Sequence, residues 1–457
     1  MALGLTSSET LESYWSLNNR RRIFYDFPNG PAPVTGLMSL AEVDPTPHPA
    51  FKWEEQRYQG IQTTILGGPT STVPFYLTGT TTTAGTPATI TAGQVLRVYV
   101  TSAADFQLDD NIGLMGLDLT TGTGDLTGVV QSTDTTASAQ FIEFRVTAAP
   151  LTTVLNSASA NIGKFVIYLG SAFAEGSRSR TGSHEVPSEL ENYTQIHKRA
   201  WESTRTAMKE PLKYEKSGAF ALDMKSNGIK FLAGLEMNLF FGRKGKTTVS
   251  DPTTGSTVTK RTSGGIRDFL EQYEVGTNYG LTDISTQTDW RTYTRKRVIK
   301  LGGATIAGAD WTEIESRAFE KTFSSDYSKL WICGAGFYNR IAAYYEGRIQ
   351  YTSLRNEGYD GFDFQLDKIR TNSGTSYFKT HPLFNDPNMT FMRNSAFCID
   401  LACLFWRPLN DSDMDIQKMI QENDADKRKD QWICEGGPEI RYPEAFVYVE
   451  NLGGITR

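Results

Sequence analysis

Two glycine-containing segments have residue types that can bind phosphate. At residues 334–336 the sequence Gly-Ala-Gly follows an apolar run and precedes a predicted helix, where glycines let a backbone approach a pyrophosphate. The third glycine of that fingerprint is missing, because Asn339 stands in its place. Residues 242–247 end like a phosphate-binding loop, but Phe240 occupies the position of the first glycine, and the segment follows a helix instead of opening one. We interpret both segments as turns and expect no cofactor.

Residues that could act as catalysts or metal ligands do not form a recognisable set. The cysteines are separated by 65, 5 and 31 residues, which is not the spacing of a zinc site. The adjacent carboxylates at residues 54–55 and 109–110 would point to opposite sides of a strand, so neither pair is a natural acid and base couple. No G-x-S-x-G elbow occurs either. We therefore expect no catalytic residue, no metal site and no enzymatic activity, with four reduced, buried thiols at Cys333, Cys398, Cys403 and Cys434.

Basic residues are concentrated in part of the chain. Between Arg205 and Lys300 there are 17 Lys and Arg against 10 Asp and Glu, although the whole chain carries a net charge of −6 and has a pI of about 5.5. A sequence-specific reader of nucleic acid would be more basic overall and would contain a groove-entering motif. Non-specific phosphate contact and pairing with carboxylates of a neighbouring subunit both fit, and we favour the second. The residues are Arg20, Arg21 and Arg22, and a basic cluster of Arg291, Arg295, Lys296 and Arg297.

The length of 457 residues exceeds one hydrophobic core and indicates two or three domains. Residues 1–50 are rich in proline, which prevents a long helix, yet they carry many aromatic side chains. We expect an extended arm that lies along another surface, its own or a neighbour's. No apolar run reaches the roughly 20 residues of a membrane span. The first residues lack the layout of a secretion signal, so we expect a protein that works where it is made or leaves by cell lysis.

An abrupt change of composition separates residues 61–170 from the rest. This window is rich in threonine and poor in charge, and it contains no Trp, Cys or His. Beta-branched or aromatic runs at residues 95–100, 141–146 and 165–169 alternate with turn residues. They predict an all-β insertion domain, a sandwich or a barrel, after a first strand at residues 51–58.

From about residue 209 to 241 the apolar period becomes helical. Gly242 supplies a stop, and the cations that follow it suit the carboxyl end of a helix dipole. We therefore predict a long helix whose apolar stripe comprises Phe220, Met224, Leu232, Leu235 and Leu239, with Phe231 beside them.

The last third of the chain alternates predicted helices and strands, which makes the fold class α+β. Asp310 is expected to cap a helix that runs to about residue 323. A buried strand at residues 330–333 precedes a helix at 337–345. A further helix is predicted at residues 413–429, followed by strands at 431–435 and 445–451.

Several short motifs, in this order and spacing, resemble those of one protein family. They are Trp-Glu-Glu at residues 53–55, Glu-Gly-Ser at 175–177, Asn-Tyr-Thr-Gln-Ile at 192–196, Arg-Thr-Ser-Gly-Gly at 261–265 and Phe-Met-Arg-Asn at 391–394. The chain is similar to the major capsid proteins of tailed bacteriophages with the Hong Kong 97-type coat fold, in the branch with a β insertion in the extended loop. The resemblance covers most of the chain beyond residue 50.

The resemblance implies a domain plan: an N-terminal arm at 1–50, an extended loop at 51–60 and 171–204, and the insertion domain at 61–170. A peripheral domain with the spine helix would occupy 205–262 and 405–457, and an axial domain 263–404. It also implies a coat protein that self-assembles into hexamers and pentamers of an icosahedral or prolate head shell around phage DNA. Its partners would be itself, packaged double-stranded DNA bound non-specifically, portal and scaffold or decoration proteins, but no membrane. The protein would be assembled in the host cytoplasm and reside in the virion.

Two other classes stay open on the residues alone: a head decoration or tail structural protein, and a carbohydrate-binding β protein fused to an enzyme. A decoration protein seldom needs a spine helix flanked by two arms. A carbohydrate-binding protein should display a cleft with paired carboxylates and clustered Trp, whereas the insertion contains no Trp.

The resemblance also suggests residues that contact neighbouring subunits. We expect Trp53→Ala to leave a folded chain that assembles poorly. We expect reversal of Arg295, Lys296 and Arg297 to Glu to impair assembly or DNA retention and not folding. The candidate inter-subunit contacts are Tyr14, Trp15, Arg20, Arg21, Arg22, Phe24, Trp53, Glu54, Glu55, Tyr58, Tyr193 and Gln195.

Overall fold

The structure is a computed structural model. It describes residues 43–456 except 57–60, 68–74, 78–87, 118, 122–124, 137–139, 149–152, 156–160, 174, 178–181, 183–186, 210–218, 251–254, 280, 282, 294, 325–326, 346–348, 356–362, 372 and 411. Most of the expected N-terminal arm therefore lies outside the described residues. So do seven of the candidate contacts, namely Tyr14, Trp15, Arg20, Arg21, Arg22, Phe24 and Tyr58.

The chain divides into two compact units. One is Arg57–Val186, and the other combines Met1–Gln56 with Pro187–Arg457. Each has its own hydrophobic core.

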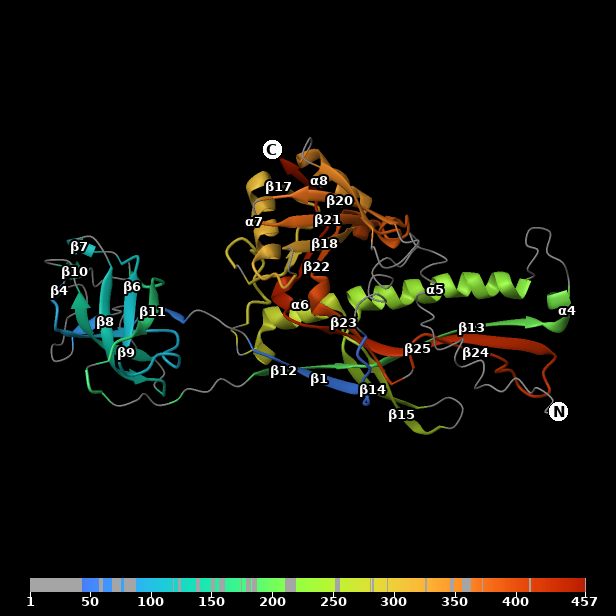
Figure 1. Cartoon of the computed structure of the whole chain (residues 1–457), viewed down its shortest axis with the longest axis horizontal. Helices are drawn as coiled ribbons and strands as arrows, with labels where there is room; N and C mark the ends of the chain where they lie inside the picture. Colours follow the sequence, from blue (N-terminus) through green and yellow to red (C-terminus); the bar gives the residue numbers. More distant parts are fainter. Residues whose placement is uncertain are drawn as a thin grey trace. The chain divides into compact units, whose positions relative to one another are not determined.

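The Arg57–Val186 unit is built on one antiparallel sheet (Figure 1). Its strands follow the order β2 (Gln62–Thr64), β11 (Phe165–Ser171), β6 (Asp110–Met115), β8 (Leu126–Asp134), β9 (Phe141–Ala148), β5 (Val95–Tyr99) and β3 (Phe75–Leu77). A bridge between Ile65 and Val100, with the Leu66 amide donating to the Tyr99 carbonyl at 2.8 Å, joins the end of β2 to the end of β5. The first six strands therefore close into a barrel. A smaller sheet has the order β4 (Ala88–Ile90), β10 (Thr153–Leu155) and β7 (Leu119–Thr121).

Alternation along the strands fills the barrel. On β8 and β9 every second side chain is buried, including Leu126, Val130, Ile142 and Phe144. No α-helix lies among the described residues of this unit. The prediction of an all-β insertion is confirmed, and of the two forms considered the barrel is the one observed.

Two antiparallel ribbons, one short and one long, belong to the larger unit (Figure 1). In the first, β1 (Ala50–Glu55) pairs antiparallel with β12 (Ser188–Tyr193). In the second, β13 (Gln195–Thr204) pairs along its whole length with β25 (Lys427–Ile440). The strands β23 (Leu404–Pro408) and β24 (Asp415–Gln417) also pair with β25.

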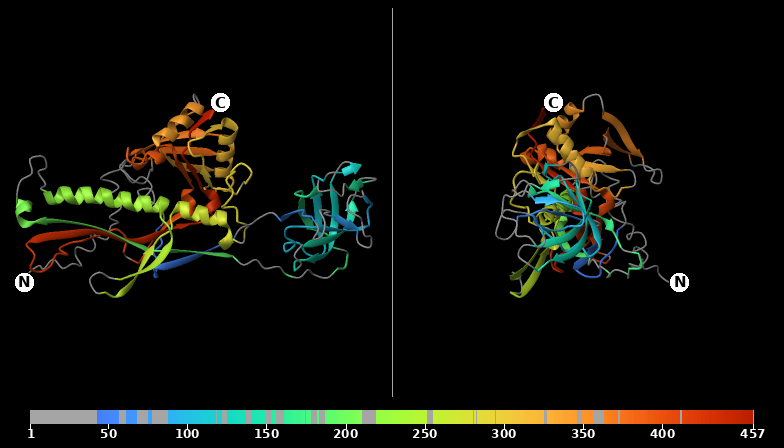
Figure 2. Two further views of the ribbon diagram at one scale, coloured as in Figure 1. Left: turned by 180° about the vertical axis from the view of Figure 1, so that it is seen from behind. Right: turned by 90° about the vertical axis from the view of Figure 1, so that its left-hand side faces the viewer.

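Helix α5 (Ala219–Phe241) runs beside β13 and β25 after a short α4 (Arg205–Lys209), as the left-hand view shows (Figure 2). Its apolar stripe faces these strands: Leu232, Leu235 and Leu239 are buried, and Phe220 and Met224 are partly buried against the same core. The helix packs on Trp432 at Gly228, where a β-carbon would lie 3.5 Å from the indole nitrogen, an ordinary contact distance. No helix in the described part of the chain is long and apolar enough to cross a membrane.

A mixed sheet forms the rest of the unit. Its order is β16 (Val298–Lys300), β26 (Val447–Glu450), β22 (Ala396–Ile399), β18 (Ser328–Cys333), β21 (Thr375–Thr380), β20 (Asp363–Arg370) and β19 (Ile349–Arg355). Strand β17 (Thr305–Ala307) pairs with β27 (Gly454–Thr456). The remaining short elements are 3₁₀ turns at Thr277–Tyr279, Leu383–Asn385, Thr390–Asn394, Leu401–Cys403 and Pro443–Ala445.

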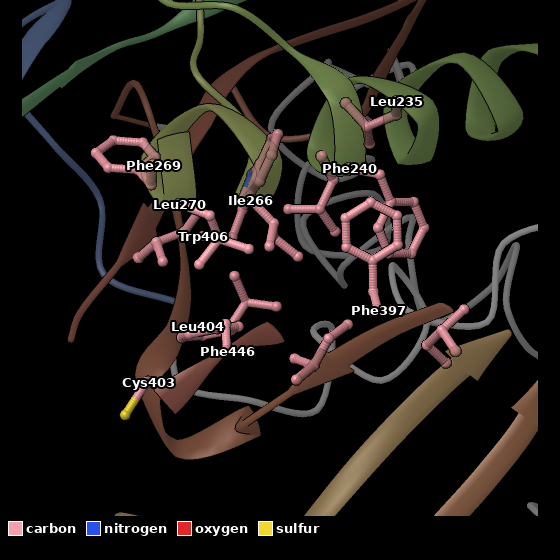
Figure 3. Packing of buried hydrophobic residues seen from close by; sticks show 14 of the residues in the cluster. Leu235, Phe240, Ile266, Phe269, Leu270, Phe397, Cys403, Leu404, Trp406 and Phe446 are labelled. Atoms are coloured by element: carbon pink, nitrogen blue, oxygen red, sulfur yellow. The ribbon is translucent and has the colours of Figure 1, made fainter. Parts of the chain in front are cut away.

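The two faces of this sheet pack against different helices. On one face Trp331 stacks on Phe337 of α8 (Ala335–Tyr344), and both rings contact Trp311 of α7 (Gly308–Phe319). On the other face Phe397 meets Phe240 at the end of α5, with ring centroids 4.8 Å apart, beside Ile266 of α6 (Ile266–Val275) (Figure 3). The four cysteines are buried and unbridged, as predicted.

The predicted helix at residues 413–429 is wrong. This stretch contains β24 and the start of β25, because pairing with β13 outweighs a charge pattern that suits a helix. Asp310 is not the N-cap residue of α7, because the helix begins at Gly308 and its N-cap is Ala307. Its carboxylate instead accepts a hydrogen bond from the Ala307 amide at 3.2 Å. The glycines at 334 and 336 serve a close approach to the Arg393 backbone.

Candidate functional site

The β1–β12 ribbon places alternate side chains of β1 in the core. Trp53 is 7% exposed and packs on Phe269 of α6 with ring centroids 5.6 Å apart. Its indole donates to Glu55 Oε1 at 3.0 Å, and the same oxygen accepts from the Tyr442 amide at 2.9 Å. Trp53 and Glu55 are therefore engaged within the chain, because one face of the ribbon is covered by the chain's own helix, and their contact with a neighbour stays a prediction. Glu54 lies on the opposite, exposed face and stays a candidate contact.

The motif at residues 192–196 connects three segments of the chain through hydrogen bonds: its own strand, the segment at Gly264 and the segment at Pro438. The buried Asn192 side chain donates to the carbonyls of Gly264 at 3.0 Å and Pro438 at 2.7 Å, and it accepts from the Gly264 amide at 2.8 Å. Gln195 accepts from the Ser263 amide at 3.0 Å. Sequence reasoning selected the motif but missed this role of Asn192. The available signal was an amide side chain, which can donate and accept at once, at the end of a strand.

Tyr193 lies between these two residues, half-buried, with the Lys244 ammonium 5.3 Å from its ring centroid. Tyr193 and Gln195 are therefore engaged within the chain, and their contact with a neighbour stays a prediction.

The predicted basic cluster is mostly internal. Lys296 is buried, with Nζ 3.3 Å from Glu274 Oε2. The Arg297 guanidinium, also buried, donates to the Arg317 carbonyl at 2.7 Å and to Glu320 at 2.5 Å. This burial predicts that reversing the cluster would impair folding as well as assembly, because a carboxylate at either position would be buried without its partner.

The other two members of the cluster are more accessible. Arg291 is exposed and binds Asp310 through two hydrogen bonds of 2.8 and 2.9 Å, which hold the pKa of that carboxyl below its usual range. Arg295 is partly buried above the ring of Tyr273.

The β14–β15 hairpin, comprising β14 (Gly245–Ser250) and β15 (Thr257–Thr262), is exposed along nearly all of its length. Val249 and Val258 stand opposite each other across the ladder, 43% and 46% exposed. Both line a groove of about 410 Å³ with Ile196, which is 55% exposed. We call these three residues the hairpin surface. A two-stranded hairpin with neither face covered is only marginally stable by itself, so this surface is suited to contact another chain.

Sequence reasoning missed the hairpin surface. The signal was present as β-branched residues on both sides of Gly255, but only residues 242–247 were considered, and they were interpreted as a turn.

A second groove, of about 460 Å³, lies between β13 and α5. Lys198, Arg199 and Lys230 line it together with His197. Burial lowers the pKa of His197 to about 4, so its imidazole is neutral at pH 7 and the positive charge of the groove comes from the other three. Within the described residues, no group of three His, Cys, Asp or Glu side chains is placed to hold a metal ion.

Comparison with models of protein families shows to which family the chain belongs. A model of the SU10 major capsid protein matches residues 28–453. The chain belongs to this family. The prediction of a tailed-phage major capsid protein is thereby confirmed, and this SU10-family capsid protein is a coat protein of the shell and a component of the virion. The decoration and carbohydrate-enzyme alternatives are set aside.

Solved capsid structures include chains similar to this SU10-family protein. That of Mycobacterium phage Ogopogo is 11% identical, with a TM-score of 0.35 over 62% of this chain and 82% of that chain. The cyanophage Pam1 capsid is 9% identical, with a TM-score of 0.34 over 62% and 83%. The capsid of a native GTA particle is 7% identical, with a TM-score of 0.36 over 62% and 81%. No curated protein matches the sequence. The predicted fold class, α+β with an all-β insertion domain, is confirmed by the described elements.

Proposed function

We propose that this capsid protein assembles through its hairpin surface into the hexamers and pentamers of a closed head shell that encloses double-stranded DNA. The observation that carries the proposal is the pair Val249 and Val258, together with Ile196, exposed in a chain whose family builds shells. Contacts repeated around a ring and over a shell are strong collectively even when each one is weak.

The domain plan belongs to the same proposal. Residues 205–262 and 405–457 would form the peripheral domain, and 263–404 the axial domain. Residues 51–60 and 171–204 would form the extended loop that carries the insertion at 61–170, and 1–50 would form the arm. The role is structural, without catalysis.

Further partners follow from what a head must do. We propose non-specific contact with packaged DNA, docking of a portal at one vertex, help from scaffold or decoration proteins, and assembly in the host cytoplasm. Lys198, Arg199 and Lys230 are the cations best placed to meet phosphate or the carboxylates of a neighbour.

The test is assembly of the recombinant chain, measured by size-exclusion chromatography with light scattering and by electron microscopy. Wild type is expected to form rings or megadalton shells, and Val249→Ser with Val258→Ser to stay unassembled. Leu222→Ser, which removes an exposed apolar side chain from α5, is the matched control and should assemble normally. Normal shells from the double variant would remove the hairpin surface from the proposal, and a monodisperse wild-type monomer would refute it.

A further inference from the structure

One wall of the barrel exposes apolar side chains to solvent. On β11 the buried Val166 points into the barrel, while Phe165 and Leu169 are 45% and 43% exposed. Leu66, which continues the outward row of β2, is also exposed. Apolar area of this kind is usually covered by another molecule.

The side chains of this wall form a continuous patch. Phe165 pairs with Met115, and Ile167 pairs with Gly113 on the neighbouring strand β6. The side chains of Leu169 and Met115 meet over Gly113, since a β-carbon there would lie 3.0 Å from Leu169 Cδ1 and 3.1 Å from Met115 Cε. We call Phe165, Ile167, Leu169, Met115 and Leu66 the barrel patch.

The wall that carries the barrel patch is uncharged, whereas another wall of the same barrel is not. The outward positions of the three strands bear no ionisable side chain; they are Gln62, Thr64 and Leu66, Phe165, Ile167 and Leu169, and Asn111, Gly113 and Met115. On β5 and β9, by contrast, Arg97 and Glu143 form an ion pair of 2.6 Å and Arg145 is exposed. The barrel patch is therefore a local feature and not a consequence of the low charge of the whole insertion.

We propose that the barrel patch docks against the barrel patch of a second copy of this chain. A contact between two identical faces brings each residue near its own counterpart across a two-fold axis, which like charges would oppose, and this wall has none. A closed shell built from rings contains two-fold positions between rings, where identical faces of two copies meet. The contact joins two barrels and does not involve the hairpin surface. It rests on the proposed function, because assembly brings the second copy of the chain into position.

Cysteine cross-linking of the full-length protein tests this contact. Ile167→Cys lies at the centre of the barrel patch, and the native cysteines are all buried, so background oxidation is low. Arg145→Cys, on the charged wall, is the matched control. After mild oxidation, shells and concentrated unassembled chain are run on denaturing, non-reducing gels. We expect Ile167→Cys to yield on the order of tenfold more two-chain product than the control in at least one of the two samples. Adding Phe165→Ser and Leu169→Ser should lower that yield to the control level.

A yield from Ile167→Cys no higher than that from Arg145→Cys in both samples would overturn the proposal. So would cross-linking to a different polypeptide, which would identify the barrel patch as the seat of an accessory protein. Light scattering on the same preparations reports separately whether shells form, so a failure of the hairpin surface and a failure of the barrel patch remain distinguishable.

Discussion

The two small ribbons of the larger unit, β1–β12 and β14–β15, have the same architecture and opposite surroundings. In the first, Trp53 is covered by α6 and Glu55 is bonded to the Tyr442 amide. In the second, Val249 and Val258 face solvent. The ribbon with the large aromatic side chain is thus a support within the chain, and the ribbon with small β-branched side chains is the one available to a neighbour. Side-chain size indicates how much area must be covered, but not which chain covers it.

Charge reversal at the buried Arg297 should have the largest effect on the unfolding free energy. It extends the comparison of buried and exposed positions from apolar to basic side chains. Arg297→Glu would place a carboxylate near Glu320 and leave the Arg317 carbonyl without its donor. We expect about 5 kcal/mol of destabilisation or failure to fold. Urea unfolding of the unassembled chain measures it. Arg291→Glu is the exposed control. If Arg297→Glu folds like wild type and only assembles poorly, the cluster belongs to the outer surface after all.

Truncation of a side chain on the β1–β12 ribbon, which α6 covers, should have the second-largest effect on the unfolding free energy. Trp53→Ala removes a buried indole packed on Phe269 and is expected to cost about 4 kcal/mol of unfolding free energy. The same urea titration measures the loss, and Trp53→Phe, which keeps an aromatic ring, should recover most of it. A stable Trp53→Ala chain that fails only in assembly would reverse the roles of the two ribbons.

The junction between the ribbons should respond to a smaller degree. Asn192→Ala removes four hydrogen bonds and leaves backbone groups of Gly264, Pro438 and Tyr193 without these partners, for an expected cost of about 2–3 kcal/mol. Hydrogen exchange of residues 263–265 should rise in this variant. Gln195→Ala, which removes bonds to Ser263 only, should cost less. Equal costs for both would show that Asn192 has no special bracing role.

Substitution on the exposed ribbon should have the smallest effect on stability. Val249→Ser with Val258→Ser is expected to change the unfolding free energy of the unassembled chain by no more than about 0.5 kcal/mol, since both side chains already face water. Thermal unfolding followed by circular dichroism measures it. A loss comparable to that of Trp53→Ala would mean that the hairpin is part of the fold and not a surface for assembly.

Much of the fold could be predicted from local pattern. The β runs of the insertion, the apolar stripe of α5 and the strand at residues 330–333 all appear where their periodicity indicated. The candidate site was less accessible to prediction. Trp53, Lys296 and Arg297 were assigned to the surface because aromatic and basic residues often mediate contacts, whereas Ile196 and the valines of the hairpin drew no attention.

By itself the sequence determined the family, through the order and spacing of short motifs, and it determined which residues share a face of each strand and helix, because these periods are properties of the backbone. Only the tertiary structure decided which of those faces are covered. Pairing between β13 and β25, more than 200 residues apart, made a strand of a stretch with a helical charge pattern. Packing of α6 on β1 buried Trp53, and closure through Ile65 and Val100 turned a row of strands into a barrel. Long-range contacts decide these outcomes because burial depends on what another part of the chain brings to a face.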